Sequence, residues 1–342
     1  MSANRLPNLG MSVPVIAAPM GGGPSTPALV VAAARAGGLG FLPGGYKTAG
    51  QLSEQIAQVR AGAASFGVNL FAPNPIPVDP GRYHEVGERL RADAERLGVS
   101  LPTDPVEDDD HWQDKIELLL ADPVPVVSFT FGIPPRAALD ALRIAGSVLV
   151  QTVTSVDEAR AAVEAGVDVL AVQGAAAGGH FATLSPDHAA PDQTLPDLLD
   201  AISRAVALPL IAAGGLADPE SVAATVAGHA DAVMVGTVLL RSSESGVSAA
   251  HRTALADPGR ATVVTRAFTG RPARGLRNTF IDRYDADAPL GYPAIHHLTS
   301  PLRRASAAQG DPEFVNLWAG TGFRHATEEP AEVILRRLAS KL

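Results

Sequence analysis

The chain has 342 residues, of which 46% are apolar and 18% charged, so it can bury a substantial core as one large domain or two ordinary ones. It lacks cysteine, which excludes disulfides, thiolate metal sites and a cysteine nucleophile. A formal net charge of −9 at pH 7, without basic clusters, argues against a nucleic-acid partner. No apolar run reaches the ~18 residues of a membrane span, and the start MSANRLPNLG lacks the basic end and apolar core of a signal peptide. We therefore expect a cytoplasmic protein without a membrane anchor.

Apolar segments rich in β-branched residues alternate with helix-like segments along most of the chain. In chain order, we expect strands at residues 13–20, 39–42, 65–71, 124–131, 147–153, 167–173, 208–213 and 232–240. The helices expected between and after them lie at residues 25–36, 49–60, 135–144, 155–165, 195–206, 219–227 and 247–254. Repeated strand–helix units of this kind predict an α/β fold, a TIM (β/α)8 barrel, whose active residues lie on the loops after the strands.

Two segments depart from this alternation. Residues 74–121 follow the third strand and contain two helical stretches on either side of the acidic run 107–110. We expect this run to be a solvated loop, because no second carboxylate cluster accompanies it. The sequence thus predicts a barrel over residues 1–260 with an insertion at about 74–121. Residues 261–342, which end in a helix at 331–340, are expected to form an extension that caps the barrel mouth.

The sixth strand leads directly into a loop suited to a ligand. The stretch 167–180, VDVLAVQGAAAGGH, passes from a buried strand into small residues and ends in a histidine. Gly178 and Gly179 leave room for the backbone to lie against a flat or anionic ligand, and the ring of His180 can reach into the space beside it. A hydrogen-bonded structural histidine and a catalytic one are both consistent with this position.

Two further strand ends carry residues suited to a phosphate, and two strands carry amides. Gly214 and Gly215 end the seventh strand, and Gly236 with Thr237 lies in the eighth, where barrels of this type often bind phosphate through backbone N–H groups. If only one of these two strand ends carried such glycines, a tight turn would be the alternative to a phosphate site. Asn69 and Gln173 belong either to a core hydrogen-bond network or to the polar edge of a bound ring system. We expect no metal, because the nine histidines show no HExxH-type spacing and cysteine ligands are absent.

An ordered set of stretches resembles the bacterial class I nitronate monooxygenases, formerly called 2-nitropropane dioxygenases. The set is VPVIAAPMGGGPSTPALVVAAARAGGLGFLPGGYKTAGQL, SFGVNLFAP, VSFTFGIP, VQGAAAGGH, PLIAAGGLAD, VMVGTVLLRSSES, TGRPARGLRN and LWAGTG. The resemblance extends from about Val13 to Gly322. Each motif alone has little specificity, whereas their occurrence in this order is highly specific.

The resemblance implies a barrel that holds FMN without covalent attachment. Ala18, Pro19, Met20 and Gly21 would lie along the flavin, while Asn69 and Gln173 would contact its polar groups. The ring edge, ribityl chain and phosphate would be held by Gly178, Gly179, Gly214, Gly215, Gly236 and Thr237. His180 matches the active-site histidine of the family. The family usually carries Glu at the position of Ala176, and the loss of this carboxylate would make His180 less basic or alter the packing of its loop.

The implied reaction is the oxidation of alkyl nitronates by O2, with FMN, to carbonyl compounds and nitrite. Neutral nitroalkanes are a second substrate form to consider. His180 would act as a base toward the neutral acid or, when protonated, as a hydrogen-bond donor to the anion, and we favour the donor role. Tyr46, Ser128 and Tyr292 are secondary candidates for the pocket wall, for which ordinary packing is an equal alternative.

Two other functions remain open at this point. One is an FMN-dependent enoyl-acyl-carrier-protein reductase on the same barrel, which would oxidise NADH. The other is a non-catalytic barrel that binds a flavin or a phosphate ligand. The expected partners are a small-molecule nitronate or nitroalkane and O2, and a homodimer is the assembly to consider.

Overall fold

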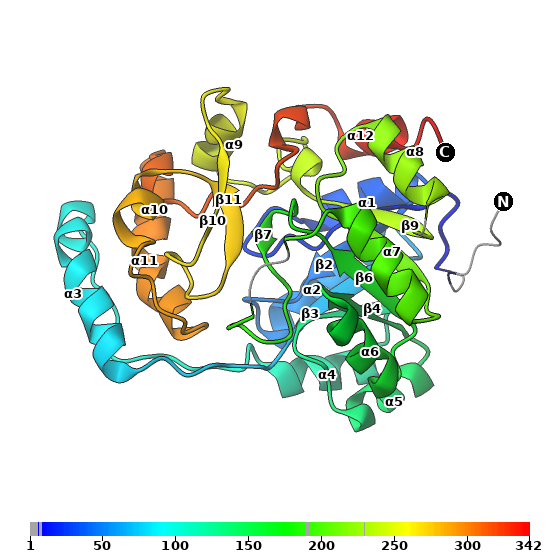
Figure 1. Ribbon diagram of the computed structural model, residues 1–342, viewed down its shortest axis with the longest axis horizontal. Coiled ribbons are helices and arrows are strands. Elements are labelled where there is room, and N and C mark those ends of the chain that lie inside the picture. The colour runs from blue at the N-terminus through cyan, green and yellow to red at the C-terminus, as the bar shows by residue number, and fades with distance from the viewer. Residues whose placement is uncertain (1–5, 7–8, 189–191, 229) are drawn as a thin grey trace.

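The computed structural model describes residues 6, 9–188, 192–228 and 230–342, so most of the N-terminal stretch considered above lies outside the described residues. Eight parallel strands close into a barrel in the order β1-β2-β3-β4-β5-β6-β8-β9. Their bounds are Val15–Ala17, Leu39–Pro43, Gly67–Ala72, Val126–Phe131, Val148–Val153, Val169–Gln173, Leu210–Ala213 and Ala232–Val235. The predicted TIM (β/α)8 barrel is therefore confirmed, and Figure 1 shows it surrounded by helices.

The barrel strands are mostly apolar because both of their faces are buried. Along β6, Val169 and Ala171 point to the apolar cluster inside the barrel, whereas Leu170 and Val172 belong to the cluster between the strands and the outer helices. The alternation follows from the two-residue period of a strand. Seven outer helices are α1 (Pro27–Arg35), α2 (Ala49–Arg60), α4 (Trp112–Ala121), α5 (Arg136–Ile144), α6 (Val156–Ala165), α7 (Leu195–Ala205) and α8 (Pro219–Ala227).

The end of the barrel differs from the expectation in two ways. Strand β9 stops at Val235, and the 3-10 helix η1 (Thr237–Leu239) replaces the last part of the strand expected at 232–240. The eighth outer position is filled by α12 (Ala331–Leu338), which packs against α1 and α8, as Figure 1 shows. Helix α9 (Ala249–Ala256), expected at 247–254 to cover the last strand, packs instead with residues of the extension. The division of the chain after residue 260 stays a proposal. Because α12 packs against α1 and α8, the extension ends against the outer wall of the barrel.

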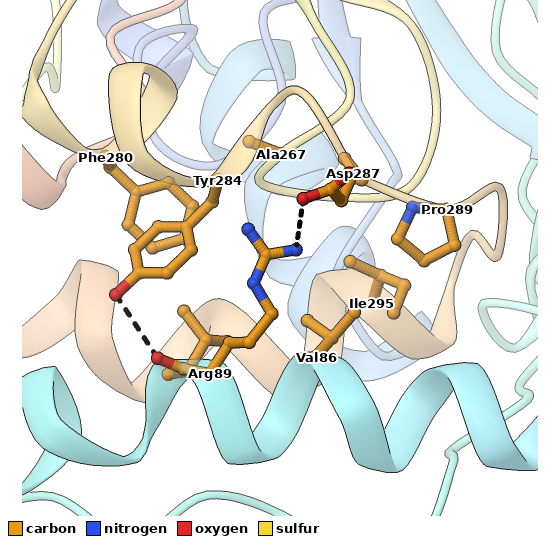
Figure 2. A pocket seen from close by; sticks show the side chains of 10 residues that line it. Val86, Arg89, Ala267, Phe280, Tyr284, Asp287, Pro289 and Ile295 are labelled. Atoms are coloured by element: carbon orange, nitrogen blue, oxygen red, sulfur yellow. Dashed lines mark hydrogen bonds and ion pairs between the residues drawn. The ribbon is translucent and has the colours of Figure 1, made fainter.

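A second apolar cluster joins the insertion to the extension. Helix α3 (Pro80–Leu97) packs against α11 (Ala294–Ala308) and α10 (Thr279–Tyr284), on the far side of the extension from the barrel (Figure 1). Figure 2 shows Arg89 of α3 between Tyr284 and Asp287, with its guanidinium 3.2 Å from the Asp287 carboxylate. Helix α4, although it also lies within residues 74–121, packs on the barrel beside α2 and α5. The part of the insertion that leaves the barrel is therefore α3 with its flanking loops.

The acidic run 107–110 is a loop in which Glu107, Asp108 and Asp109 are exposed, as expected, but two of its carboxylates also bind other parts of the chain. The Asp108 carboxylate lies 2.6 Å from Nε2 of His297 on α11. Asp110 pairs at 2.7 Å with the fully buried Lys115, and its other oxygen accepts a hydrogen bond from the backbone N–H of Tyr46 at 2.8 Å. The run therefore ties the insertion to α11 and to the loop after β2.

A small antiparallel sheet lies over the barrel mouth. It has the order β10-β11-β7, with bounds Thr262–Thr265, Ala273–Leu276 and Gly179–His180. The two residues of β7 were expected in a loop, and they become a strand because their backbone pairs with Ala273 and Arg274 of the extension. The extension also contains the 3-10 helices η2 (Pro312–Phe314) and η3 (Phe323–His325). No helix in the described residues has both the length and the apolarity required to cross a membrane.

The packing of α12 on the barrel can be tested with two substitutions on this helix. Leu335 is 2% exposed, so Leu335→Ala leaves a cavity and should lower the free energy of unfolding by about 2–5 kcal/mol in urea denaturation. Val333, on the same helix, is 45% exposed, and Val333→Ala should change this free energy by less than about 0.5 kcal/mol. Equal effects of the two substitutions would contradict the packing of α12 on the barrel.

Candidate active site

A cavity of about 570 Å³ lies at the carboxyl ends of the barrel strands. Its wall includes Asn69 of β3, Thr130 of β4 and Gln173 of β6, together with residues of the C-terminal extension. This is the end of the barrel where loops bring side chains from different strands together. The volume falls within the roughly 300–1,000 Å³ of small-molecule and cofactor pockets.

Most of the residues predicted from the sequence meet around this cavity. Its wall contains Ala18, Pro19, Met20, Gly21, Tyr46, Asn69, Gln173, Gly178, Gly179, His180, Gly214, Gly215, Gly236 and Thr237. Two predicted residues do not line it. Ser128 is 2% exposed and its hydroxyl accepts a hydrogen bond from Asn69 Nδ2 at 2.9 Å, so it belongs to the core beneath the cavity. Tyr292 packs against the ring of His180, with 5.7 Å between the ring centroids.

One end of the cavity is built from backbone rather than side chains. Gly214 and Gly215 have φ of +118° and +78°, which side-chain-bearing residues rarely adopt. A Cβ on Gly215 would lie 2.9 Å from the Cβ of Ala176, so Ala176 lies beside this glycine pair. Gly320 closes the end by donating its N–H to Thr237 Oγ1 at 2.9 Å. The result is a cradle of exposed backbone that added side chains would fill.

Strand pairing and hydrogen bonds place the ring of His180 at the cavity. Its Nε2 lies 2.9 Å from Thr269 Oγ1, and the Thr269 hydroxyl also lies 3.2 Å from the carbonyl oxygen of Arg271. A hydroxyl has a single hydrogen. When Thr269 donates it to Arg271, Nε2 of His180 must carry the proton and donate to Thr269. We assign this tautomer on that basis, and it leaves Nδ1 as the unprotonated nitrogen.

The ring of His180 is neutral. The surrounding protein withdraws it from bulk solvent although one side borders the cavity, and this desolvation, with the positive charges of Arg271 and Arg303, lowers its pKa to about 3. A neutral ring with Nε2–H engaged by Thr269 offers a hydrogen-bond acceptor. This favours a neutral acceptor over the charged donor preferred from the sequence, and it makes the ring a weaker base than a free imidazole until an anion binds beside it.

The amides of Asn69 and Gln173 differ in how much of their hydrogen-bonding capacity remains for a ligand. Gln173 Nε2 donates to the carbonyl oxygen of His180 at 3.1 Å, and its Oε1 accepts from the N–H of Ala182 at 2.8 Å. Gln173 therefore fixes the strand that carries His180. Asn69 Nδ2 donates to Thr130 Oγ1 at 2.9 Å, while its Oδ1 accepts no hydrogen bond from the described residues. That oxygen remains available on the cavity wall.

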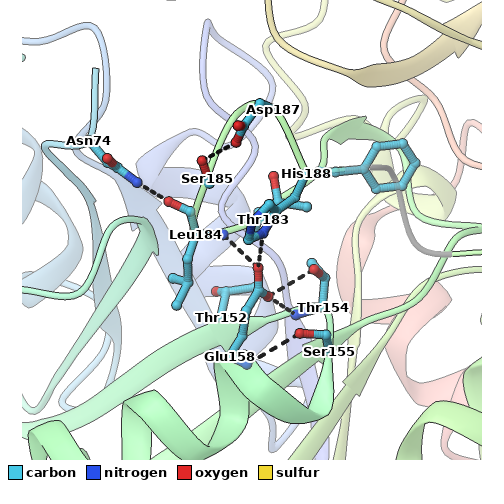
Figure 3. Close-up of polar contacts among 12 residues, drawn as sticks. Asn74, Thr152, Thr154, Ser155, Glu158, Thr183, Leu184, Ser185, Asp187 and His188 are labelled. Carbon is cyan, nitrogen blue, oxygen red and sulfur yellow. Dashed lines mark hydrogen bonds and ion pairs between the residues drawn. The ribbon is translucent and has the colours of Figure 1, made fainter. Parts of the chain in front are cut away.

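Two buried charged residues, Glu158 and Arg271, hold the loop that follows β7, and Figure 3 shows the contacts of Glu158. Glu158, at the start of α6, accepts hydrogen bonds from the N–H of Leu184 at 2.7 Å and from the hydroxyl of Thr154 at 2.8 Å. Arg271 donates from Nε to the carbonyl oxygen of Phe181 at 3.3 Å. The loop is thus bound on one side to the barrel and on the other to the extension, which limits the movement of His180.

The contribution of α11 to the cavity was not predicted from the sequence. His296, Ser300 and Arg303 lie on one face of this helix and line the wall, joined by Arg304, Asn316 and Trp318. The ring of His296 stacks on Tyr46, with 4.4 Å between centroids. Polar residues at 296, 300 and 303 follow the three- and four-residue spacing of a helical face, which was the available signal.

Comparison with known proteins shows that the chain is similar to them over nearly its whole length. A family model described as nitronate monooxygenase matches residues 5–340. The probable nitronate monooxygenase of Staphylococcus aureus (strain Newman) is 36% identical over 346 aligned residues, which cover 99% of this chain and 97% of that protein. The solved structure of a nitroalkane oxidase from Streptomyces ansochromogenes is 42% identical, with a TM-score of 0.93 over 97% of this chain and 96% of that one. FabK from Thermotoga maritima is 26% identical, with a TM-score of 0.75 over 97% and 93% of the two chains.

The buried histidines predict how stability depends on pH. Desolvation lowers the pKa of His180 to about 3 and of His251 to about 4, and lowers that of His296 well below 6.5. Below pH ~6.5 the unfolded chain binds protons that the folded protein does not bind. The free energy of unfolding should therefore fall as the pH decreases from about 6.5 toward 4, as measured by urea denaturation at several pH values.

Two variants separate this effect from general acid sensitivity. His251→Gln removes one buried ring and should reduce the slope by up to about 1.4 kcal/mol per pH unit. His84 is exposed, so His84→Gln should leave the slope unchanged. A free energy of unfolding that stays constant over this pH range in the unsubstituted protein would contradict the prediction.

Proposed function

The chain belongs to the nitronate monooxygenase family and is an oxidoreductase, and we propose on this premise that it oxidises alkyl nitronates with O2 to carbonyl compounds and nitrite, with FMN as cofactor. One observation carries the proposal: a neutral histidine with an unprotonated nitrogen stands at a strand-end cavity that also contains a glycine cradle. Membership of this enzyme family argues against the alternative that the chain is a non-catalytic flavin- or phosphate-binding barrel.

The residues present fit FMN. The phosphate would lie at Gly214, Gly215 and Gly236, which line the cavity without a side chain, so that backbone N–H groups could bind it. The ring would lie along Ala18–Gly21, where the free Oδ1 of Asn69 can accept a hydrogen bond from a ring N–H. When bound, FMN supplies the acceptance of electrons from the nitronate and their transfer to O2, which protein side chains cannot perform.

The proposed task of His180 depends on the form of the substrate. A neutral nitroalkane must lose the proton on the carbon beside the nitro group, and Nδ1 of His180 is the atom that would accept it. A nitronate has already lost this proton and needs no base. Its negative charge beside the ring would raise the pKa of His180 from its low value, so the ring becomes better able to hold a proton once the anion is present.

The cofactor proposal is tested first by what the protein releases. Freshly purified protein should release FMN in equimolar amount on denaturation. Gly215→Val should lower this content, because its side chain would meet Ala176 and fill the cradle at a backbone φ of +78°. Gly146→Val imposes comparable backbone strain, at a φ of +103° with no atom within 4 Å, and Gly146 does not line the cavity. Release of FAD, or full FMN content in Gly215→Val, would contradict the assignment.

The base role is tested by two substrate forms and one variant. His180→Ala should reduce the rate on a neutral nitroalkane by about 10²–10⁴-fold, while appreciable activity on the pre-formed nitronate remains. Oxygen consumption and nitrite formation measure both rates at equal flavin content. A comparable loss on both forms would instead support a donor role, and near-native rates on both would remove His180 from the mechanism.

Thr269 should act through the tautomer of His180. Thr269→Val removes the acceptor of the Nε2 proton, so we expect a smaller loss on the neutral nitroalkane than His180→Ala causes, with Thr269→Ser restoring the rate. The ¹⁵N chemical shifts of the ring should show mixed tautomers in the valine variant. An unchanged tautomer together with an unchanged rate would exclude this role.

A further inference from the structure

Arg303 is a buried cation whose hydrogen-bond partners are all neutral. Its side chain is 8% exposed. Nε donates to Thr299 Oγ1 at 3.2 Å, Nη2 donates to the carbonyl oxygen of His296 at 2.7 Å, and Nη1 donates to Asn316 Oδ1 at 3.4 Å. These contacts fix the orientation of the guanidinium and leave its charge uncompensated.

No carboxylate of the described residues pairs with this guanidinium within 4.0 Å. Other arginines of the extension do have acidic partners: Arg283 lies 3.0 Å from Asp93, and Arg260 lies 2.6 Å from Glu313. A buried charge without a counter-charge lowers stability, so its presence calls for an anion that is not part of the chain.

Arg303 lies where such an anion would meet His180. It lines the cavity from α11 beside His296 and Ser300. Its Nη2 lies 3.3 Å from Nδ1 of His296, and the rings of His296 and His180 both pack against Tyr292, with centroid distances of 6.1 and 5.7 Å, so the three groups lie close together at the cavity. Arg271, the other buried arginine near His180, sits with its Cζ 4.0 Å from the ring centroid of Phe131 and does not line the cavity. Of the two buried arginines near His180, Arg303 is therefore the one that a ligand can reach.

We propose that Arg303 is a specificity-determining residue that selects an anionic nitronate over the neutral nitroalkane. The inference rests on the proposed function. The two substrate forms have nearly the same size and the same nitro oxygens, and they differ by one proton and one negative charge. Because Arg303 is only 8% exposed, solvent screens its charge weakly, so the charge attracts the anion more strongly than the neutral form, which it attracts only through its dipole. Removing this charge should therefore change the ratio of the two specificity constants.

Three variants separate charge from hydrogen bonding. Arg303→Gln keeps amide N–H donors but loses the charge, and it should lower the nitronate-to-nitroalkane ratio of kcat/KM by about tenfold or more. Arg303→Lys keeps the charge and should retain most of the ratio. Arg35→Gln removes the same charge from an exposed residue of α1 that does not line the cavity, where solvent screens the charge, and should change the ratio by less than about twofold.

A second readout does not depend on turnover. Nitrate is a planar oxyanion with the charge of a nitronate but no carbon to oxidise, and its binding can be followed by the change in flavin absorbance. It should bind about tenfold more weakly to Arg303→Gln than to Arg35→Gln. FMN content should be equal in the two variants, because the proposed phosphate cradle is built from other residues.

The outcomes distinguish the inference from the proposed function. An unchanged ratio and unchanged nitrate binding in a folded, flavin-loaded Arg303→Gln would overturn the inference while leaving nitronate oxidation intact. If Arg303→Gln loses FMN while the nitronate-to-nitroalkane ratio of kcat/KM is unchanged, the inference would also be overturned, because the charge of Arg303 would then bind the cofactor. If the unsubstituted protein oxidises neither substrate form, the proposed function fails, and weaker nitrate binding by Arg303→Gln would still support an anion site at Arg303.

Discussion

The candidate site depends on the pairing of a two-residue strand from the barrel with a strand from the C-terminal extension. Gly179 and His180 hydrogen-bond as β7 to Arg274 and Ala273 of β11, and this contact converts the loop after β6 into a fixed edge of the cavity. Gln173 binds the same segment from the barrel side through both ends of its amide. The barrel thus supplies the cavity floor, and the extension determines where the histidine ring stands.

The same arrangement accounts for the electrostatics of the cavity. The extension brings Arg271 and Arg303 near His180, and together with desolvation their charges lower its pKa to about 3. A neutral histidine beside an uncompensated arginine is suited to an anionic ligand, because the cation attracts the anion while the ring can still accept a proton. A protonated histidine would add a second charge next to Arg303 and would be disfavoured until an anion is bound.

The barrel could be predicted from the sequence because its strands are buried on both faces. Runs such as residues 167–173 have no polar face, and glycine pairs mark where strands such as β8 end. Long-range packing could not be predicted in the same way. The pattern of residues 331–338 predicts a helix, but nothing local shows that it replaces α9 against the barrel wall. Arg303 likewise lies on a helix remote in sequence from every strand end, and its role depends on partners that only the folded chain assembles.

The most direct test of the account is the identity of the compound that reduces the bound flavin. The FMN-loaded protein is mixed without oxygen with a pre-formed alkyl nitronate and, separately, with NADH, and the loss of flavin absorbance is followed over time. The account predicts that the nitronate bleaches the flavin and that NADH leaves it oxidised over the same period. Rapid bleaching by NADH with none by the nitronate would contradict it and would favour the enoyl reductase alternative.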